Sequence, residues 1–208
     1  VRTMASSGSF SGSIRDGHYK LRVDWSQSKN VSANTSTVTC KLYLVNDWSL
    51  NISGRSDNKC TIDGTALTYA SPAVSTIGTH LLGTVSRTVS HASDGSKSLA
   101  ISAVFYIRAT LSGTYYDSIS ASANITLDSI PRASSVSAAN MTMGTAGKIN
   151  ISRASSSFTH TLTYSFGNSS GTIATKTTAT SVSWTPPLSL ASQIPNAISG
   201  TCTITCTT

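Results

Sequence analysis

The sequence has 208 residues, a formal net charge of +7 and a hydrophobic fraction of 38%. This length allows one or two domains with cores of their own, and we expect two. The apolar fraction is too high for a disordered Ser/Thr-rich stalk, and no apolar run approaches the roughly 20 residues that span a bilayer. All eight acidic residues are Asp, and the wealth of Thr, Val and Ile favours strands over helices.

Alternating apolar and polar residues predict a series of antiparallel strands before residue 130, each with one buried face. In chain order these strands cover residues 19–25, 37–45, 48–52, 60–62, 65–69, 80–90, 97–109 and 116–127. Asp63-Gly64 is a two-residue hairpin signal, and residues 93–96 form a second turn signal. Arg87 is in phase with the apolar residues of its strand, which predicts that this strand lies at the edge of a sheet or crosses the rim.

A domain boundary is expected at residues 128–132, because Pro131 lacks the amide hydrogen that a ladder needs. Beyond it we predict strands near residues 148–153, 158–166, 180–184 and 201–208, and one short helical turn after Pro186. Short strands separated by turn residues are typical of Ig-like or fibronectin-III-like sandwiches. The predicted fold is therefore all-β, with two tandem Ig-like/fibronectin-III-like β-sandwich domains over residues 1–130 and 131–208.

The second domain is expected to be incomplete, because no closing strand follows its last alternating residues. The chain starts at Val1 without a signal segment, and residues 201–208 stop without a turn. We therefore expect a piece of a longer polypeptide.

The four cysteines do not predict a disulfide framework. Cys202 and Cys206 are four residues apart in an alternating strand, which separates their Cα atoms by about 13 Å and prevents pairing. Cys40 and Cys60 each alternate with apolar residues, as small buried hydrophobic side chains do. A bridge between Cys40 and Cys60 stays open, but reduced thiols are the expected state.

Residues that could carry catalysis are not arranged for it. A glycosidase needs two carboxylates about 5 to 10 Å apart, one with a raised pKa, whereas these Asp residues lie in turn signals, the linker, or polar faces and loops. A Gly-flanked stretch has Phe10 where a nucleophilic serine would stand. No histidine pair has zinc-ligand spacing, and Asp57, Asn58 and Asp63 lack the order of a calcium loop. We predict no enzyme activity, no metal and no cofactor.

The positive charge suits an acidic partner, either a nucleic acid or an anionic cell-wall polymer. The basic residues are scattered singly, with neither a basic run nor a recognition helix. We therefore expect no nucleic-acid partner and no membrane partner.

Sugar binding is the site hypothesis that the residues support best, since an exposed aromatic ring can stack on the apolar face of a pyranose. Trp48, Tyr115 and Tyr116 lie near turn signals and are the candidate ligand-binding residues. Trp25 and Trp184 are in phase with apolar neighbours and are expected in the core. For the three candidates, a role in a core or between domains is the alternative.

Several segments resemble modules of tail proteins from siphophages of Gram-positive bacteria: Tyr19–Trp25, 34–38, His91–Leu99, Ile130–Val136 and Arg153–His160. The resemblance covers most of the chain and is strongest to a minor structural protein family, a domain of unknown function, of streptococcal siphophages. It implies a virion protein of the phage tail, made in the host cytoplasm, with other tail proteins as partners. It supplies no catalytic residues, and the chain ends before the C-terminal region expected in that family.

Two hypotheses about function follow, and a third stays open, in which the chain is the accessory domain of an enzyme whose catalytic part lies outside these 208 residues. In the first, the chain is a virion structural module that contributes to tail-tip architecture and host adsorption, and that forms homo-oligomers. In the second, it recognises host cell-wall carbohydrate. A solvent-facing aromatic cluster separates the two, because only the second has a use for one.

Overall fold

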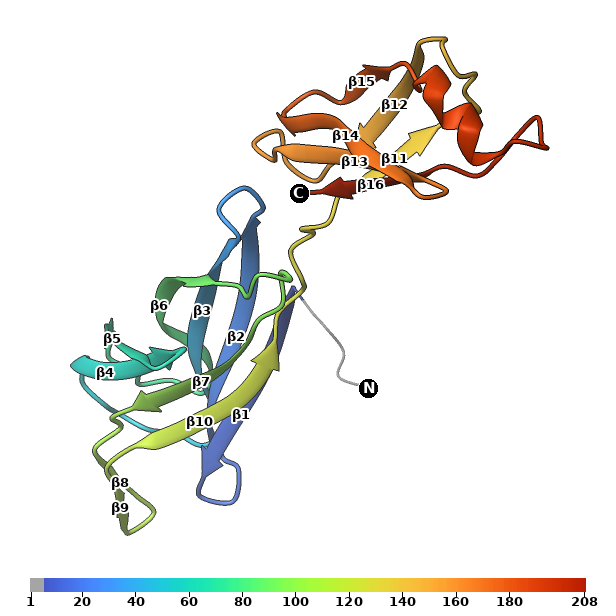
Figure 1. Ribbon diagram of the computed structural model, residues 1–208. Helices are drawn as coiled ribbons and strands as arrows, with labels where there is room; N and C mark the ends of the chain where they lie inside the picture. The colour runs from blue at the N-terminus through green and yellow to red at the C-terminus, as the bar shows by residue number, and fades with distance from the viewer. Residues whose placement is uncertain (1–5) are drawn as a thin grey trace. The chain divides into compact units, whose positions relative to one another are not determined.

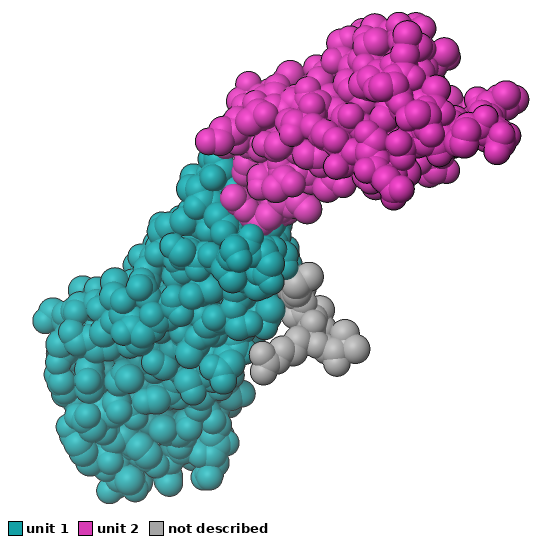
Figure 2. Space-filling model, viewed as in Figure 1, with its two compact units in different colours: residues 1–130 teal, residues 131–208 magenta. Residues whose placement is uncertain are grey.

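The computed structural model describes residues 6–208, which form two compact units, one ending at Ile130 and one spanning Pro131–Thr208 (Figures 1 and 2). We call them unit 1 and unit 2. Among these residues the regular elements are antiparallel strands and one short 3-10 helix, η1 (Leu188–Gln193). The all-β prediction is confirmed. No helix in this part of the chain has the length and apolarity needed to cross a membrane.

Unit 1 contains two four-stranded sheets and a small hairpin (Figure 1). The first sheet has the strand order β1 (Ser7–Ile14), β2 (Tyr19–Asn30), β3 (Thr35–Asn46) and β6 (Gly78–Ser90). The second has the order β10 (Ile119–Thr126), β7 (Ser98–Phe105), β4 (Arg55–Ile62) and β5 (Thr65–Ser71). The hairpin pairs β8 (Ala109–Leu111) with β9 (Thr114–Tyr116).

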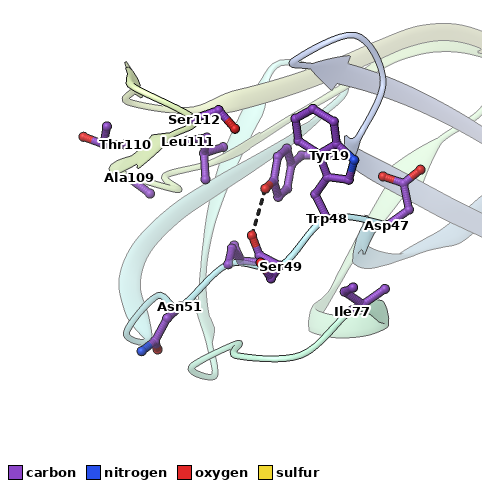
Figure 3. A pocket seen from close by; sticks show the side chains of 11 residues that line it. Tyr19, Asp47, Trp48, Ser49, Asn51, Ile77, Ala109, Thr110, Leu111 and Ser112 are labelled. Atoms are coloured by element: carbon purple, nitrogen blue, oxygen red, sulfur yellow. Dashed lines mark hydrogen bonds between the residues drawn. The ribbon is translucent and has the colours of Figure 1, made fainter.

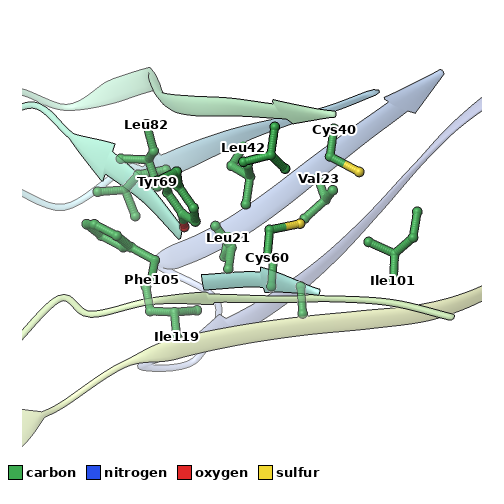
Figure 4. Close-up of a cluster of buried hydrophobic side chains, with 14 of the residues drawn as sticks. Leu21, Val23, Cys40, Leu42, Cys60, Tyr69, Leu82, Ile101, Phe105 and Ile119 are labelled. Atoms are coloured by element: carbon green, nitrogen blue, oxygen red, sulfur yellow. The ribbon is translucent and has the colours of Figure 1, made fainter. Parts of the chain in front are cut away.

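The core of unit 1 lies between these two sheets. Every second residue of β2 from Tyr19 to Trp25 is buried, as the alternation predicts. The inner face of the second sheet supplies fully buried residues such as Ile101 and Phe105 (Figure 4). Cys40 and Cys60 are free, fully buried thiols on opposite sheets. The hydrogen bond with Cys60, together with burial, raises the pKa of the Cys40 thiol.

The two sheets approach each other closely along both edges. At one edge β1 lies beside β10, and at the other β5 lies beside β6. A Cβ atom added at Gly12 would lie 1.8 Å from the carbonyl oxygen of Ser120. One added at Gly83 would lie 2.8 Å from the Tyr69 ring. At these two positions the absence of a side chain allows the edge strands of the two sheets to approach this closely.

Two expectations about unit 1 need correction. β1 was not predicted, because its sequence consists mostly of Ser and Gly around Phe10 and Ile14. The segment 48–52 is not a strand: only Ile52 makes a ladder contact, an isolated bridge to Val74. Leu50 and Ile52 are nevertheless buried, so their alternation reflects insertion into the core without strand pairing.

Unit 2 is smaller and has two three-stranded sheets. One has the order β11 (Ser135–Ala138), β12 (Gly147–Ser152) and β15 (Ser181–Trp184), and the other the order β14 (Ser169–Thr177), β13 (His160–Phe166) and β16 (Thr203–Thr207). Ile149, Ile151 and Leu162 form the buried cluster. The predicted helical turn is present as η1, with Pro187 at its N-terminal cap.

Candidate functional site

An open cavity of about 620 Å³ lies in unit 1 (Figure 3). It is bounded by the β3–β4 segment, which is the connection of residues 47–54 between these two strands, and by the β8–β9 hairpin. Its lining combines one exposed indole, the tyrosine at the start of β2 and small polar residues. The full lining is Tyr19, Asp47, Trp48, Ser49, Leu50, Asn51, Ile77, Ala109, Thr110, Leu111 and Ser112.

Hydrogen bonds from side chains to backbone carbonyls hold the β3–β4 segment in place, where a strand would have ladder hydrogen bonds. The hydroxyl of Tyr19 donates a hydrogen bond of 2.9 Å to the carbonyl of Ser49 (Figure 3). The amide nitrogen of Asn46 donates to the carbonyls of Trp48, at 2.8 Å, and Thr76, at 3.1 Å. Burial, and then the charge of Asp47, raise the pKa of Tyr19, which keeps its hydroxyl a donor. These bonds fix the backbone that presents Trp48.

Trp48 is 39% exposed and packs against the β1–β2 turn. The His18 ring stacks on the indole with a centroid distance of 3.6 Å and an interplanar angle of 15°. Nδ1 of His18 lies 2.7 Å from Oδ1 of Asp47, and the Arg15 guanidinium lies 5.9 Å from the Trp48 ring centroid. One face of the indole is thus occupied by His18, so a sugar can stack only on the opposite face.

The β8–β9 hairpin forms the other wall of the cavity. Arg108, just before the hairpin, contacts Asp57 at 2.6 Å and Asp117 at 3.7 Å. The hydrogen bond between Arg108 and Asp57 raises the pKa of the arginine and lowers that of the carboxyl. Leu111 is buried in the core of unit 1. Two ion pairs and one apolar anchor therefore position this wall.

The structure separates the three predicted ligand-binding residues. Trp48 lines the cavity, whereas Tyr115, 60% exposed, lies outside the lining. Tyr115 is directly opposite Thr110, so both side chains lie on one face of the hairpin. Tyr116 is half-buried and packs against the core of unit 1.

Sequence reasoning missed Arg15, His18 and Tyr19 as neighbours of Trp48. The turn signal Asp16-Gly17 shows that β1 and β2 could form a hairpin, but nothing in the pattern shows that the turn lies against residue 48. The predicted core tryptophans differ: Trp25 is buried, and Trp184 is half-buried against Tyr164 in unit 2.

Unit 2 has a larger open groove of about 1110 Å³. Met141, Phe166, Trp184 and Ile204 contribute to its lining of mixed polar and apolar surface, and nothing in the structure shows what covers it. Within residues 6–208 no three His, Cys, Asp or Glu side chains are grouped in a way that could hold a metal ion.

Comparison with protein families finds a match over residues 9–208, to a family described as siphovirus protein of unknown function (DUF859). The chain belongs to this siphovirus family. Comparison with curated proteins finds no match, and neither does comparison with solved structures. The family membership indicates a virion-associated bacteriophage protein.

Ser36, His91 and Gly95, from two of the segments that resemble siphophage tail proteins, join Gln27 and Asp128 in a polar network in unit 1. Nε2 of Gln27 donates to Oγ of Ser36, at 2.9 Å, and to the carbonyl of Asp128, at 3.0 Å. Oγ of Ser36 lies 2.7 Å from Nε2 of His91, whose Nδ1 donates to the carbonyl of Gly95 at 2.8 Å. These residues hold the last segment of unit 1 in place.

Proposed function

We propose that the chain is a non-enzymatic structural module of a siphophage tail that contributes to tail-tip architecture and host adsorption. The observation that carries the proposal is the siphovirus family match over residues 9–208. Its partners in this proposal are other tail proteins and further copies of this chain. Its relatives in this proposal are proteins of streptococcal phages. Two β-rich units suit this role, because rigid sandwiches can space other parts of an assembly.

A fibronectin-III-like or Ig-like topology is part of this proposal. In unit 2, the sheet orders β11-β12-β15 and β14-β13-β16 support it, because consecutive strands are shared between two facing sheets as in such sandwiches. In unit 1, two four-stranded antiparallel sheets support a sandwich more generally.

The carboxylates support a role without catalysis. The hydrogen bond with Arg108 lowers the pKa of Asp57, and hydrogen bonds from Ser96 lower the pKa of Asp94. A glycosidase acid needs the opposite shift. Asp63 is ion-paired with Lys97 at 2.8 Å, as a structural carboxylate is.

The test is the location of the chain in the virion. Antibodies raised against residues 6–130 and detected by immunogold electron microscopy should label the tail tip of intact particles. Labelling of the capsid, or the absence of the chain from purified virions that carry all their other proteins, would overturn the structural proposal.

A second candidate function, binding of Gram-positive cell-wall polysaccharide, is favoured by the exposure of Trp48 at the mouth of the cavity. Trp48 offers a ring face to a pyranose beside an open cavity, although Tyr115 and Tyr116 do not join it in an aromatic cluster. Purified chain should bind Gram-positive cells and isolated wall polysaccharide saturably, and Trp48→Ala should lower that binding at least about tenfold. Tyr43→Ala, which removes an aromatic ring from the outer face of β3, is the matched control; equal loss in both variants would contradict the site.

A further inference from the structure

Arg15 differs from its counterparts elsewhere in unit 1 and unit 2. Within residues 6–208 its guanidinium has no hydrogen-bond or ion-pair partner, although its Nε atom is buried. Carboxylates or carbonyls contact five other arginines: Arg22, Arg55, Arg87, Arg108 and Arg153. Nε of Arg22 also lacks a hydrogen bond, but it lies 3.1 Å from the Asp24 carboxylate, whereas Arg15 has no ion pair among the residues that the structure describes. A shielded donor without an acceptor is unfavourable, so the site of Arg15 lacks an acceptor that a ligand could supply.

The backbone at Arg15 is also unusual. Its φ is +52°, followed by +51° at Asp16 and +88° at Gly17. Left-handed turn positions favour Gly, which has no Cβ to crowd the following carbonyl oxygen, and Asn or Asp, whose short side chains can hydrogen-bond locally. The requirements of the turn therefore do not explain an arginine here, and a strained residue beside a cavity points to a role other than folding.

The carboxylate beside the Trp48–His18 stack already has a partner. His18 stacks on Trp48 and uses Nδ1 for Asp47, while its Nε2 has no hydrogen-bond partner in the described part of the chain. The Asp47 carboxylate is thus engaged by His18. A guanidinium presents parallel N–H donors that match the two oxygens of a carboxylate or phosphate.

We propose that Arg15, held against Trp48, binds an oxyanion, phosphate or carboxylate, carried by a saccharide that contacts Trp48. This inference rests on the carbohydrate-binding proposal above and adds the class of glycan. Arg15 forms the charged hydrogen bonds, and the face of Trp48 opposite His18 contacts the sugar ring. Neutral wall polysaccharides are then poor ligands.

The first experiment is a titration of the full chain followed by NMR, with the indole N–H of Trp48 and the Nε–H of Arg15 as reporters. The probes are glucose 1-phosphate, glucuronate, methyl α-glucoside and inorganic phosphate. At least one of the two charged sugars should shift both reporters and bind about tenfold more tightly than the neutral glucoside. The two charged sugars distinguish phosphate from carboxylate.

Each contrary result has a distinct meaning. Equal affinity for the neutral and charged sugars, with Trp48 shifted, would overturn the oxyanion site and leave carbohydrate binding standing. Inorganic phosphate that binds as tightly as glucose 1-phosphate would overturn recognition of a saccharide. If none of the probes, nor wall polysaccharide, shifts either reporter, both proposals fail.

Variants of the turn separate binding from folding. Arg15→Gly removes the guanidinium and suits the positive φ, so it should abolish the preference for charged sugars while the midpoint of thermal unfolding stays the same or rises. Arg15→Lys should retain part of the preference. Lys20→Ala removes an exposed positive charge from the same hairpin and should leave the preference unchanged. If Lys20→Ala lowers affinity as much as Arg15→Gly, net charge explains the binding and the site is overturned.

Discussion

Unit 1 and unit 2 are both built from pairs of antiparallel sheets, but they bury their apolar residues to different degrees. In unit 1 both sheets supply fully buried side chains, including Leu42, Ile62 and Phe105. In unit 2 the buried cluster is Ile149, Ile151 and Leu162, and around it Val182, Trp184 and Ile204 are only half-buried. The same alternation of apolar residues therefore gives a core that is more completely buried in unit 1 than in unit 2. We expect unit 2 to have the lower free energy of unfolding.

The largest expected effect tests this comparison directly. Phe105→Ala in unit 1 should lower the free energy of unfolding by about 4 kcal/mol, because it leaves a cavity among fully buried neighbours. Leu162→Ala in unit 2 should cost about 2 kcal/mol, since half-exposed neighbours can collapse or admit water. Urea unfolding followed by tryptophan fluorescence, with Trp184→Phe to report on unit 1 alone, measures both. A larger loss for Leu162→Ala would reverse the comparison.

The next prediction concerns the edge of unit 1 where β1 lies beside β10. Gly12→Ala should destabilise unit 1 by about 2 kcal/mol, because the new Cβ meets the backbone of Ser120. Gly8→Ala on the same strand is the matched control, because its Cβ meets only the side chain of Trp25, 2.8 Å away at the nearest atom. We expect its cost to be smaller, and equal losses in the same urea assay would show that the approach of β1 to β10 is not tight.

Each unit also has a buried histidine that contacts a serine, and the two histidines differ in how many of their ring nitrogens have a hydrogen-bond partner. His91 has partners on both ring nitrogens, whereas His160 contacts Ser134 at 2.7 Å through Nε2 and has no partner at Nδ1. Ser36→Ala should cost about 1 to 2 kcal/mol, because it deprives both His91 and Gln27 of a partner. Ser134→Ala affects one partner and should cost less. Hydrogen exchange at the amides of Leu127 and Ile130 should accelerate only in Ser36→Ala.

Much of the fold could be predicted from the alternation of apolar residues, because burial of one face imposes a period of two. Tyr19 to Trp25 follows this rule directly. β1 could not be predicted in this way, since its small residues serve contact with β10 and do not supply an apolar face. The segment 48–52 misled the prediction because core insertion without a ladder gives the same alternation as a strand.

The candidate site was only partly visible in the sequence. Trp48 could be singled out because a large aromatic residue beside turn signals is a candidate for exposure, and it is exposed. Arg15 and His18 could not, because their positions depend on how the β1–β2 turn lies against a segment thirty residues further on. The positive φ of Arg15 is likewise a property of the folded backbone, and no residue type in the pattern indicates it.

The smallest expected effect concerns two residues with left-handed backbones, one in each unit. Arg15 has a φ of +52° and Lys176, in β14, one of +48°. Replacing either by Gly should stabilise the chain by about 0.5 kcal/mol, since relief of crowding at Cβ slightly exceeds the entropy that Gly loses on folding. Thermal unfolding measures both changes. If Arg15→Gly destabilises the chain while Lys176→Gly stabilises it, the Arg15 side chain contributes to folding, and its retention in a strained turn would no longer indicate a ligand.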